Sequence, residues 1–131
     1  MNKPKIESIL THLAPQPIGP YSQAVVFQDM FFCSGQIGLD PNGVLQTGIT
    51  NQTRQIMENL KNILNASGSN FSSVLKSTIY LVNMDDFPVV NEIYASYFQP
   101  PFPARATIGV QSMPKGALVE IDMIALAIFN F

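Results

Sequence analysis

Apolar residues recur at helical spacing in two segments of the chain. The first segment spans residues 50–66, and its apolar face comprises Ile49, Thr53, Ile56, Met57, Leu60, Ile63 and Leu64. Thr50 or Asn51 suits the start of this predicted helix, and Ser67-Gly68 suits its end. The second segment spans residues 87–98, with its stripe at Phe87, Val90, Ile93, Tyr94 and Tyr97. The prolines that follow prevent the second helix from continuing.

Short apolar and β-branched runs predict five strands, at residues 24–27, 30–34, 74–82, 102–110 and 118–129. Gln28-Asp29 suits a tight hairpin between the first two, and residues 40–43 are typical of a turn. Residues 1–20 are expected to be irregular because they hold several prolines. The order of elements predicts one α+β domain over residues 1–131, with two helices packed on one face of a mixed sheet.

Composition changes this picture in one respect. Charged residues make up 12% of the 131 residues, against about 25% in an average soluble protein. We expect a second copy of the chain to cover the sheet face that the helices leave open. A surface rich in Asn, Gln, Ser and Thr is the alternative explanation, and this chain has many such residues.

Charge and hydropathy also exclude some partners. The net charge of −2 and the lack of any Lys/Arg run argue against a nucleic-acid partner. The longest apolar run, at residues 123–129, is too short to span a bilayer, so we expect no membrane partner. The N-terminus lacks the apolar stretch of a signal peptide, which predicts a cytoplasmic protein.

The single cysteine and the single histidine limit the possible chemistry. Cys33 follows Phe31-Phe32 and is expected to be a buried apolar residue rather than a nucleophile. His12 lies in a proline-rich segment and is expected to be a solvated loop residue. These residues predict no internal disulfide, no metal site, and no catalytic pair of a serine or cysteine with a histidine.

Arg105 is the most informative residue, because it lies in a predicted apolar strand and cannot lose its charge. It must therefore meet an anion or line a cavity. Residues 113–116 look like a turn, and a hairpin there would bring Arg105 near Glu120 and Asp122 of the last strand. Two explanations remain open: Arg105 binds a small carboxylate substrate, or it forms an ion pair that ties the hairpin together.

A set of short motifs covers nearly the whole chain from about Ala14 onward. They are Ile18-Gly19-Pro20-Tyr21-Ser22-Gln23-Ala24, Ser34-Gly35-Gln36-Ile37, Lys76-Ser77-Thr78-Ile79-Tyr80-Leu81, Asp86-Phe87 before Val90-Asn91, Phe102-Pro103-Ala104-Arg105 and Leu118-Val119-Glu120-Ile121. Each motif alone is weak evidence. In this order and spacing they resemble the RidA/YjgF family of reactive-intermediate deaminases.

The resemblance implies a fold, an assembly and an activity. The family is similar in fold to small chorismate mutases, and its members are typically homotrimers with a cleft between each pair of subunits. Its best known activity is the hydrolysis of 2-imino acids, such as 2-iminobutanoate and 2-iminopropanoate, to 2-oxo acids and ammonia. The resemblance therefore implies that this chain is a 2-iminobutanoate/2-iminopropanoate deaminase. It also implies that the reaction needs no cofactor and no metal.

The resemblance also implies roles for individual residues. Arg105 matches the arginine that binds the substrate carboxylate, and Glu120 matches the acidic residue near the attacking water. Tyr21 matches the tyrosine that follows Gly-Pro in the family, and with Arg105 and Glu120 it completes the implied catalytic set. Its hydroxyl would bond to the substrate or the water, and its ring would form part of the pocket wall. The substrate-binding positions would further include Ser34, Gly35, Asn91, Ala106 and Thr107. Five of these residues have a purely structural alternative: an ion pair for Arg105 or Glu120, a packed ring for Tyr21, a turn at Gly35, and an exposed polar residue at Asn91. Asp122 is expected to be structural.

Thr107 departs from the family pattern. Many members have Arg-Ser-Cys where this chain has Arg105-Ala106-Thr107. Threonine retains the backbone contacts and offers a hydroxyl, but it cannot supply a thiol. A mechanism or a regulation that relies on a cysteine at this position is therefore excluded. Because Arg105 and Glu120 remain, the departure bears mainly on rate and substrate preference, whose direction the sequence does not fix.

Three other functions are compatible with the same motifs. The first is a non-catalytic ligand-binding or regulatory protein that senses 2-oxo acids or amino acids in the same cleft. The second is RNA cleavage or inhibition of translation, which the acidic balance disfavours. The third is a chaperone-like role, which would need an exposed apolar patch.

Overall fold

One mixed sheet forms the frame of the molecule. The structure is a computed structural model and describes residues 5–127. Its strands are β1 (Ile6–Ile9), β2 (Ala24–Phe27), β3 (Met30–Cys33), β4 (Gln36–Ile37), β5 (Val74–Leu81), β6 (Ala104–Gly109) and β7 (Val119–Leu126). They lie in the order β1-β2-β3-β7-β5-β6, and β4 pairs with β7 beside β3. All pairings are antiparallel except that of β5 with β6.

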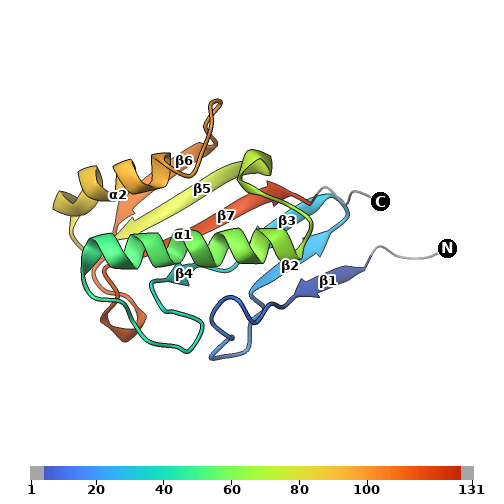
Figure 1. Ribbon diagram of the computed structural model, residues 1–131, viewed down its shortest axis with the longest axis horizontal. Coiled ribbons are helices and arrows are strands. Elements are labelled where there is room, and N and C mark those ends of the chain that lie inside the picture. Colours follow the sequence, from blue (N-terminus) through green and yellow to red (C-terminus); the bar gives the residue numbers. More distant parts are fainter. Residues whose placement is uncertain (1–4, 128–131) are drawn as a thin grey trace.

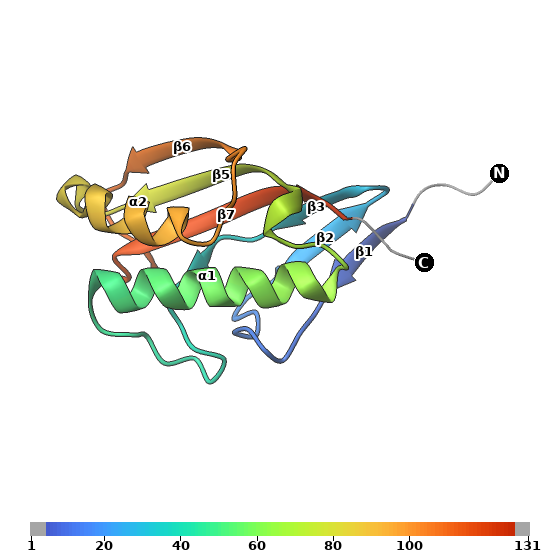
Figure 2. The ribbon, with the colours of Figure 1, turned by 45° about the horizontal axis from the view of Figure 1, so that its top comes forward.

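Two helices cover one face of this sheet (Figures 1 and 2). The long helix α1 (Gly48–Ala66) runs across the middle strands, and the shorter α2 (Phe87–Ala95) packs near β5 and β6. Short 3₁₀ turns at Phe71–Ser73, Met84–Asp86 and Pro114–Gly116 lie between the longer elements. The predicted α+β architecture, with two helices on one face of a mixed sheet, is confirmed.

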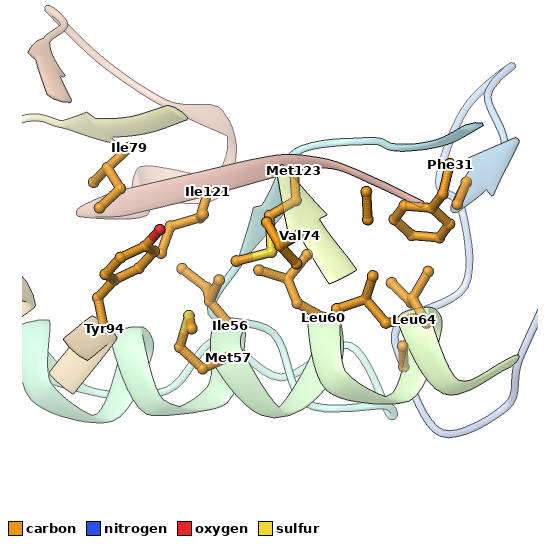
Figure 3. Close-up of a cluster of buried hydrophobic side chains, with 14 of the residues drawn as sticks. Phe31, Ile56, Met57, Leu60, Leu64, Val74, Ile79, Tyr94, Ile121 and Met123 are labelled. Carbon is orange, nitrogen blue, oxygen red and sulfur yellow. The ribbon is translucent and has the colours of Figure 1, made fainter. Parts of the chain in front are cut away.

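The core lies between the helices and the sheet (Figure 3). The predicted apolar face of α1 is buried there, with Ile56, Leu60 and Leu64 fully inaccessible to solvent. Alternate residues of β7 face them from the sheet, and Ile121 and Met123 are the largest. Because side chains alternate along a strand, the residues between these, Glu120 and Asp122, lie on the open face.

Polar residues of α1 hold the loop that follows β4. The Nε2 of Gln52 donates to the carbonyl of Gln46, and its Oε1 accepts from the N–H of Leu118. Asn59 Nδ2 donates to the carbonyl of Leu39 at 2.8 Å. Both side chains are buried, and their hydrogen bonds offset the cost of burial. They fix the loop that carries Leu39 against α1.

The predicted hairpin between Arg105 and Glu120 is wrong. Strand β6 runs parallel to β5, and β5 lies between β6 and β7. Parallel neighbours require a crossover connection, which α2 supplies, so β5, α2 and β6 form one βαβ unit. The segment with Lys115 and Gly116 at positive φ is a 3₁₀ turn that leads across β5 to β7. Arg105 therefore lies two strands away from Glu120.

Other boundaries differ in smaller ways. Residues 6–9, expected to be irregular, form strand β1 on β2, because no proline lies within residues 5–14. The strand β4 was not predicted, since it is two residues long. Helix α1 begins at Gly48, and the end predicted at Ser67-Gly68 is confirmed, with Gly68 at φ 79°. Residues 128–129 of the last predicted strand lie outside the described residues.

Candidate active site

Glu120 lies at the wall of a cavity of about 310 Å³ on the open side of β7. The predicted site residues Tyr21, Ser34 and Gly35 line the same cavity. The rest of its wall is largely apolar and consists of Pro15, Gln16, Ile18, Gln23, Gln36, Ile37, Leu39 and Pro114. A mostly apolar cavity with a few convergent polar groups is typical of a small-molecule site.

Gly35 leaves room for the Glu120 side chain. A Cβ at residue 35 would lie 2.6 Å from Glu120 Oε2 and 2.7 Å from its carboxyl carbon. Such distances are well inside van der Waals contact, so any larger residue at this position would displace the carboxyl group. Gly35 is therefore required by the close approach of the backbone and not by a special backbone angle.

The surroundings of Glu120 change the acidity of its carboxyl group. Burial raises the pKa of the Glu120 carboxyl above its usual value, and the charge of Asp122 adds to this effect. Asp122 lies two residues along the same face and accepts a hydrogen bond of 2.9 Å from the hydroxyl of Tyr80. Tyr80 is the register partner of Glu120 on β5. A raised pKa makes the corresponding carboxylate a stronger proton acceptor.

The N-terminal segment forms the outer wall of this cavity and is held by Gln23. The Oε1 of Gln23 accepts from the N–H of Thr11, and its Nε2 donates to the carbonyls of Thr11 and Pro15. Tyr21 is 47% exposed, and its hydroxyl oxygen accepts from the N–H of Ile18. The phenolic proton of Tyr21 is thus left to donate to a bound molecule.

Arg105 lies in a second cavity of about 410 Å³, which it shares with Asn91, Tyr94, Ala95, Phe102 and Pro103. Its Nη1 donates to Asn91 Oδ1 at 2.7 Å. Within residues 5–127 the ion pair seen is Lys61 with Glu58, so the ion pair of Arg105 with Glu120 or Asp122 is absent there. Within the same residues the guanidinium donates to Asn91, which leaves most of its N–H donors without a partner there.

The two cavities lie on opposite faces of the sheet. Arg105 pairs with Ser77, whose hydroxyl contacts Tyr94 of α2, so Arg105 points to the helix side. Glu120 pairs with Tyr80 on the open side. The structure thus brings Tyr21, Ser34, Gly35 and Glu120 together, and separately Arg105 with Asn91. One small substrate cannot touch both groups in a single chain.

Comparison with known proteins agrees with these features. The model of a family described as endoribonuclease L-PSP matches residues 11–127 of this chain. A mouse protein named 2-iminobutanoate/2-iminopropanoate deaminase is 46% identical over 120 residues, which cover 90% of this chain and 89% of that protein. The chain belongs to the RidA/YjgF family.

Solved structures of RidA/YjgF family proteins share the fold. RidA from the Antarctic bacterium Psychrobacter sp. PAMC 21119 superposes with a TM-score of 0.90 at 39% identity, covering 92% of this chain and 98% of that one. The structure of E. coli TdcF with bound serine superposes with a TM-score of 0.88 at 35% identity, covering 92% and 98%. The recognition of the family from its motifs is confirmed.

Ala106 and Thr107 follow Arg105 on β6, the last strand in the sheet order of this RidA/YjgF member. Ala106 pairs with Thr78 and faces the open side, whereas Thr107 pairs with the buried Ile79 and faces the helices. The Oγ1 of Thr107 is buried and has no hydrogen-bond partner in the part of the chain that the structure describes. A buried hydroxyl without a hydrogen bond costs about 1–3 kcal/mol of folding free energy. Within residues 5–127 this family member therefore has a destabilising polar group two residues from Arg105.

Sequence reasoning missed several residues of both cavities. The apolar wall residues Ile37 and Leu39 have sequence neighbours typical of a strand or a loop. No local sequence pattern indicates that they face a cavity. Phe87 and Tyr94 fitted the apolar stripe of α2, yet the Arg105 guanidinium carbon lies 5.5 Å and 5.2 Å from their ring centroids. The parallel pairing of β5 with β6 brings these rings to Arg105, and a sequence pattern does not reveal that pairing.

Two further absences concern the residues that the structure describes. Within residues 5–127 no three His, Cys, Asp or Glu side chains gather in a group that would hold a metal ion. In the same range, neither helix is both long and apolar enough to cross a membrane.

Cys33 does not contribute a nucleophile to either cavity. It pairs with Ala24 of β2, and its Sγ accepts a hydrogen bond of 3.1 Å from the N–H of Met123. Burial raises the pKa of the Cys33 thiol to about 12. The thiolate is the reactive form, so this result agrees with the expectation that Cys33 is not a nucleophile.

We expect the Cys33 thiol to be nearly inert in the folded protein. At pH 8 a thiol with a pKa of about 12 is about one part in ten thousand thiolate. Reaction with Ellman's reagent should therefore be at least about a thousandfold slower in the native protein than in guanidinium chloride. Because Cys33 is the single cysteine, one absorbance trace reports it. A native rate close to the unfolded rate would contradict the burial of this thiol.

The Gly35→Ala variant should move the Glu120 carboxyl into the open cavity without unfolding the protein. The added Cβ meets the flexible end of a side chain, which can shift toward solvent. The raised pKa of Glu120 should then fall toward that of an ordinary glutamate, about 4.3. A carboxyl ¹³C NMR titration measures this. Gly19→Ala is the matched control, since its Cβ would lie 3.6 Å from the Tyr21 ring. An unchanged titration in Gly35→Ala would refute the close packing of residue 35 on Glu120.

Proposed function

We propose that this protein hydrolyses 2-imino acids, 2-iminobutanoate and 2-iminopropanoate among them, to 2-oxo acids and ammonia. Likeness over nine-tenths of the chain to proteins named 2-iminobutanoate/2-iminopropanoate deaminase supports this reaction. The single structural observation that carries it is a pair of cavities. One holds an arginine that has no ion-pair partner within residues 5–127, and the other holds a half-buried carboxyl group. The cytoplasmic location stays a prediction from the sequence.

In this proposal the substrate lies in a cleft between two copies of the chain. Arg105 of one copy binds the carboxylate, and Glu120 of the next copy faces the imine carbon. The opposite orientation of the two residues within one chain supports this arrangement. The open face also exposes apolar side chains, with Phe27 38%, Phe32 42% and Ile108 45% accessible. Burying such side chains favours association, and the family resemblance implies that the assembly is a trimer.

The reaction needs little more than a positioned water. A 2-imino acid protonated on nitrogen, R–C(=NH₂⁺)–COO⁻, has an electrophilic carbon next to the carboxylate. Glu120 accepts a proton from the water as its oxygen bonds to that carbon, which forms a tetrahedral amino alcohol. Glu120 then returns the proton to the nitrogen, and the C–N bond breaks to release ammonia. The hydroxyl proton passes to Glu120 and from there to the ammonia, which leaves as ammonium as the 2-oxo acid forms. The raised pKa of the Glu120 carboxyl makes its carboxylate a stronger acceptor for the proton of the attacking water.

The other predicted residues would position the substrate. The hydroxyl of Tyr21 would donate a hydrogen bond to the water or the substrate, and the backbone at Ser34 and Gly35 would form the wall beside Glu120. Asn91 would hold Arg105 through its Oδ1 and offer its NH₂ group to the ligand. The backbone of Ala106 and Thr107, at the sheet edge, would contact the carboxylate side. No step requires a cofactor or a metal.

A second candidate function is non-catalytic binding of small carboxylates. The relative TdcF, whose structure holds a bound serine, favours this candidate. The same Arg105 would bind an amino acid or a 2-oxo acid through its carboxylate. RNA cleavage, which the name of the family model raises, is less well supported. The chain has seven basic and nine acidic residues, and RNA binding depends on clustered positive charge.

The decisive experiment compares wild type with Arg105→Ala and Arg105→Lys. Threonine dehydratase generates 2-iminobutanoate, semicarbazide traps it, and the protein competes by hydrolysing it. Loss of two charge-assisted hydrogen bonds, worth about 1.5–3 kcal/mol each, should lower kcat/KM by about a hundredfold or more in Arg105→Ala. The kcat/KM of Arg105→Lys should lie between those of wild type and Arg105→Ala, because lysine keeps the charge but not the planar guanidinium group. Arg54→Ala, on the exposed side of α1, is the control and should retain full activity.

Two results would overturn parts of this proposal. Full activity of a folded Arg105→Ala protein would remove Arg105 from the site. If the wild type itself does not suppress semicarbazone formation but binds 2-oxobutanoate, the protein is the binding member and not the deaminase.

A further inference from the structure

Arg105 is held by neutral groups of α2. Its Nη1 donates to Asn91 Oδ1 at 2.7 Å, and its guanidinium carbon lies 5.2 Å from the ring centroid of Tyr94 and 5.5 Å from that of Phe87. A cation near the faces of aromatic rings is attracted by their quadrupoles. These partners restrain the guanidinium and leave its charge intact. A carboxylate partner would instead neutralise that charge.

The position of the Tyr94 ring is set by the core and not by Arg105. Tyr94 is 3% exposed and reaches from α2 toward the sheet, with its hydroxyl pointing to the strands (Figure 3). That hydroxyl donates to Ser77 Oγ at 2.9 Å, and Ser77 is fully buried. The ring also lies 4.7 Å from the ring of Phe98. Tyr94 is therefore fixed by a hydrogen bond at one end and by packing along its side.

Ser77 links this arrangement to the strand that carries Arg105. It is the register partner of Arg105 across the parallel pairing of β5 with β6. The chain thus closes a ring of contacts from Arg105 to Tyr94, from Tyr94 to Ser77, and from Ser77 back to Arg105. Burial is the main cause that raises the pKa of the Tyr94 phenol, so the phenol stays neutral and keeps its proton for Ser77.

We propose that Phe87 and Tyr94 form an aromatic slot that orients Arg105 before the substrate arrives, with Tyr94 as a positioning residue that acts through Arg105. This inference rests on the proposed function, in which Arg105 binds the substrate carboxylate. Arginine has many rotamers, and a bidentate contact requires one of them. A slot that selects this rotamer in the free protein removes the ordering cost from the binding step. The slot therefore determines affinity for planar carboxylates rather than the chemistry at the imine carbon.

The first test measures the motion of Arg105 directly. The chain has two arginines, Arg54 and Arg105, so their side-chain Nε–H signals can be assigned with Arg54→Lys. The order parameter of Arg105 Nε–H should be about 0.8, near that of rigid backbone, whereas that of the exposed Arg54 should lie below about 0.6. In Tyr94→Leu the Arg105 value should fall toward that of Arg54. An Arg105 that is as mobile as Arg54 in the wild type would overturn the proposal.

The second test measures binding of 2-oxobutanoate by calorimetry, which does not depend on turnover. Tyr94→Leu should weaken binding by about tenfold, or 1.4 kcal/mol, whereas Tyr94→Phe keeps the ring and should stay within about threefold. In the imine assay Tyr94→Leu should raise KM more than it lowers kcat. Tyr97→Leu is the matched control, because Tyr97 packs on Phe71 and bonds to Glu58. It should leave 2-oxobutanoate binding unchanged.

The outcomes separate the slot from the proposed function. If Arg105→Ala binds 2-oxobutanoate as well as wild type, the role of Arg105 in the proposed function fails, and the slot with it. If Arg105→Ala loses binding but Tyr94→Leu keeps it, the slot alone is wrong. If Tyr94→Phe is as weak as Tyr94→Leu, the hydroxyl and not the ring matters, which also overturns the slot. If Tyr94→Leu does not fold, the partly buried Phe87→Leu decides by the same measurements.

Discussion

The alternation of side chains along β7 and its neighbours is the constraint on which the rest of the structure depends. A strand turns successive residues to opposite faces. Val119, Ile121 and Met123 enter the core beneath α1, so Glu120 must face the open side. Two strands away, the same rule turns Arg105 toward α2, because its register partner Ser77 belongs to the buried row. Neither orientation can be reversed without turning the buried side chains of that strand toward the open face.

In the proposed function, this constraint gives each chain two half-sites, one on each face of the sheet. The carboxyl half is sheltered by the N-terminal segment that Gln23 holds, and Gly35 gives Glu120 its space. The arginine half is built on the βαβ unit, where α2 supplies the amide and both rings that contact the guanidinium. A second copy that covers the open face would complete both halves at once. The low fraction of charged residues, 12%, agrees with a surface that is partly buried by association.

Much of this arrangement could be predicted from the sequence, and the failures have a common cause. The helices and the principal strands were predicted because their periodicity is local. The hairpin between Arg105 and Glu120 was wrong because strand order is not a local property, and α2 inserts β5 between their strands. The residues Arg105, Glu120, Tyr21, Ser34, Gly35 and Asn91 were marked by family motifs, and the structure places each at a cavity. Phe87 and Tyr94 were assigned to the core alone, because the apolar stripe of a helix does not reveal that a cation such as Arg105 contacts its rings.

The central claim is that one active site uses Arg105 of one chain and Glu120 of another. It is tested most directly by co-expressing Arg105→Ala and Glu120→Gln chains with different tags and purifying oligomers that carry both. In a mixed trimer one cleft of three joins an intact Arg105 to an intact Glu120, so about a third of the wild-type deaminase activity should return. Oligomers of two differently tagged Arg105→Ala chains should stay inactive. Mixed oligomers that are no more active than either variant alone would mean that both residues act within one chain, which contradicts a site shared between chains.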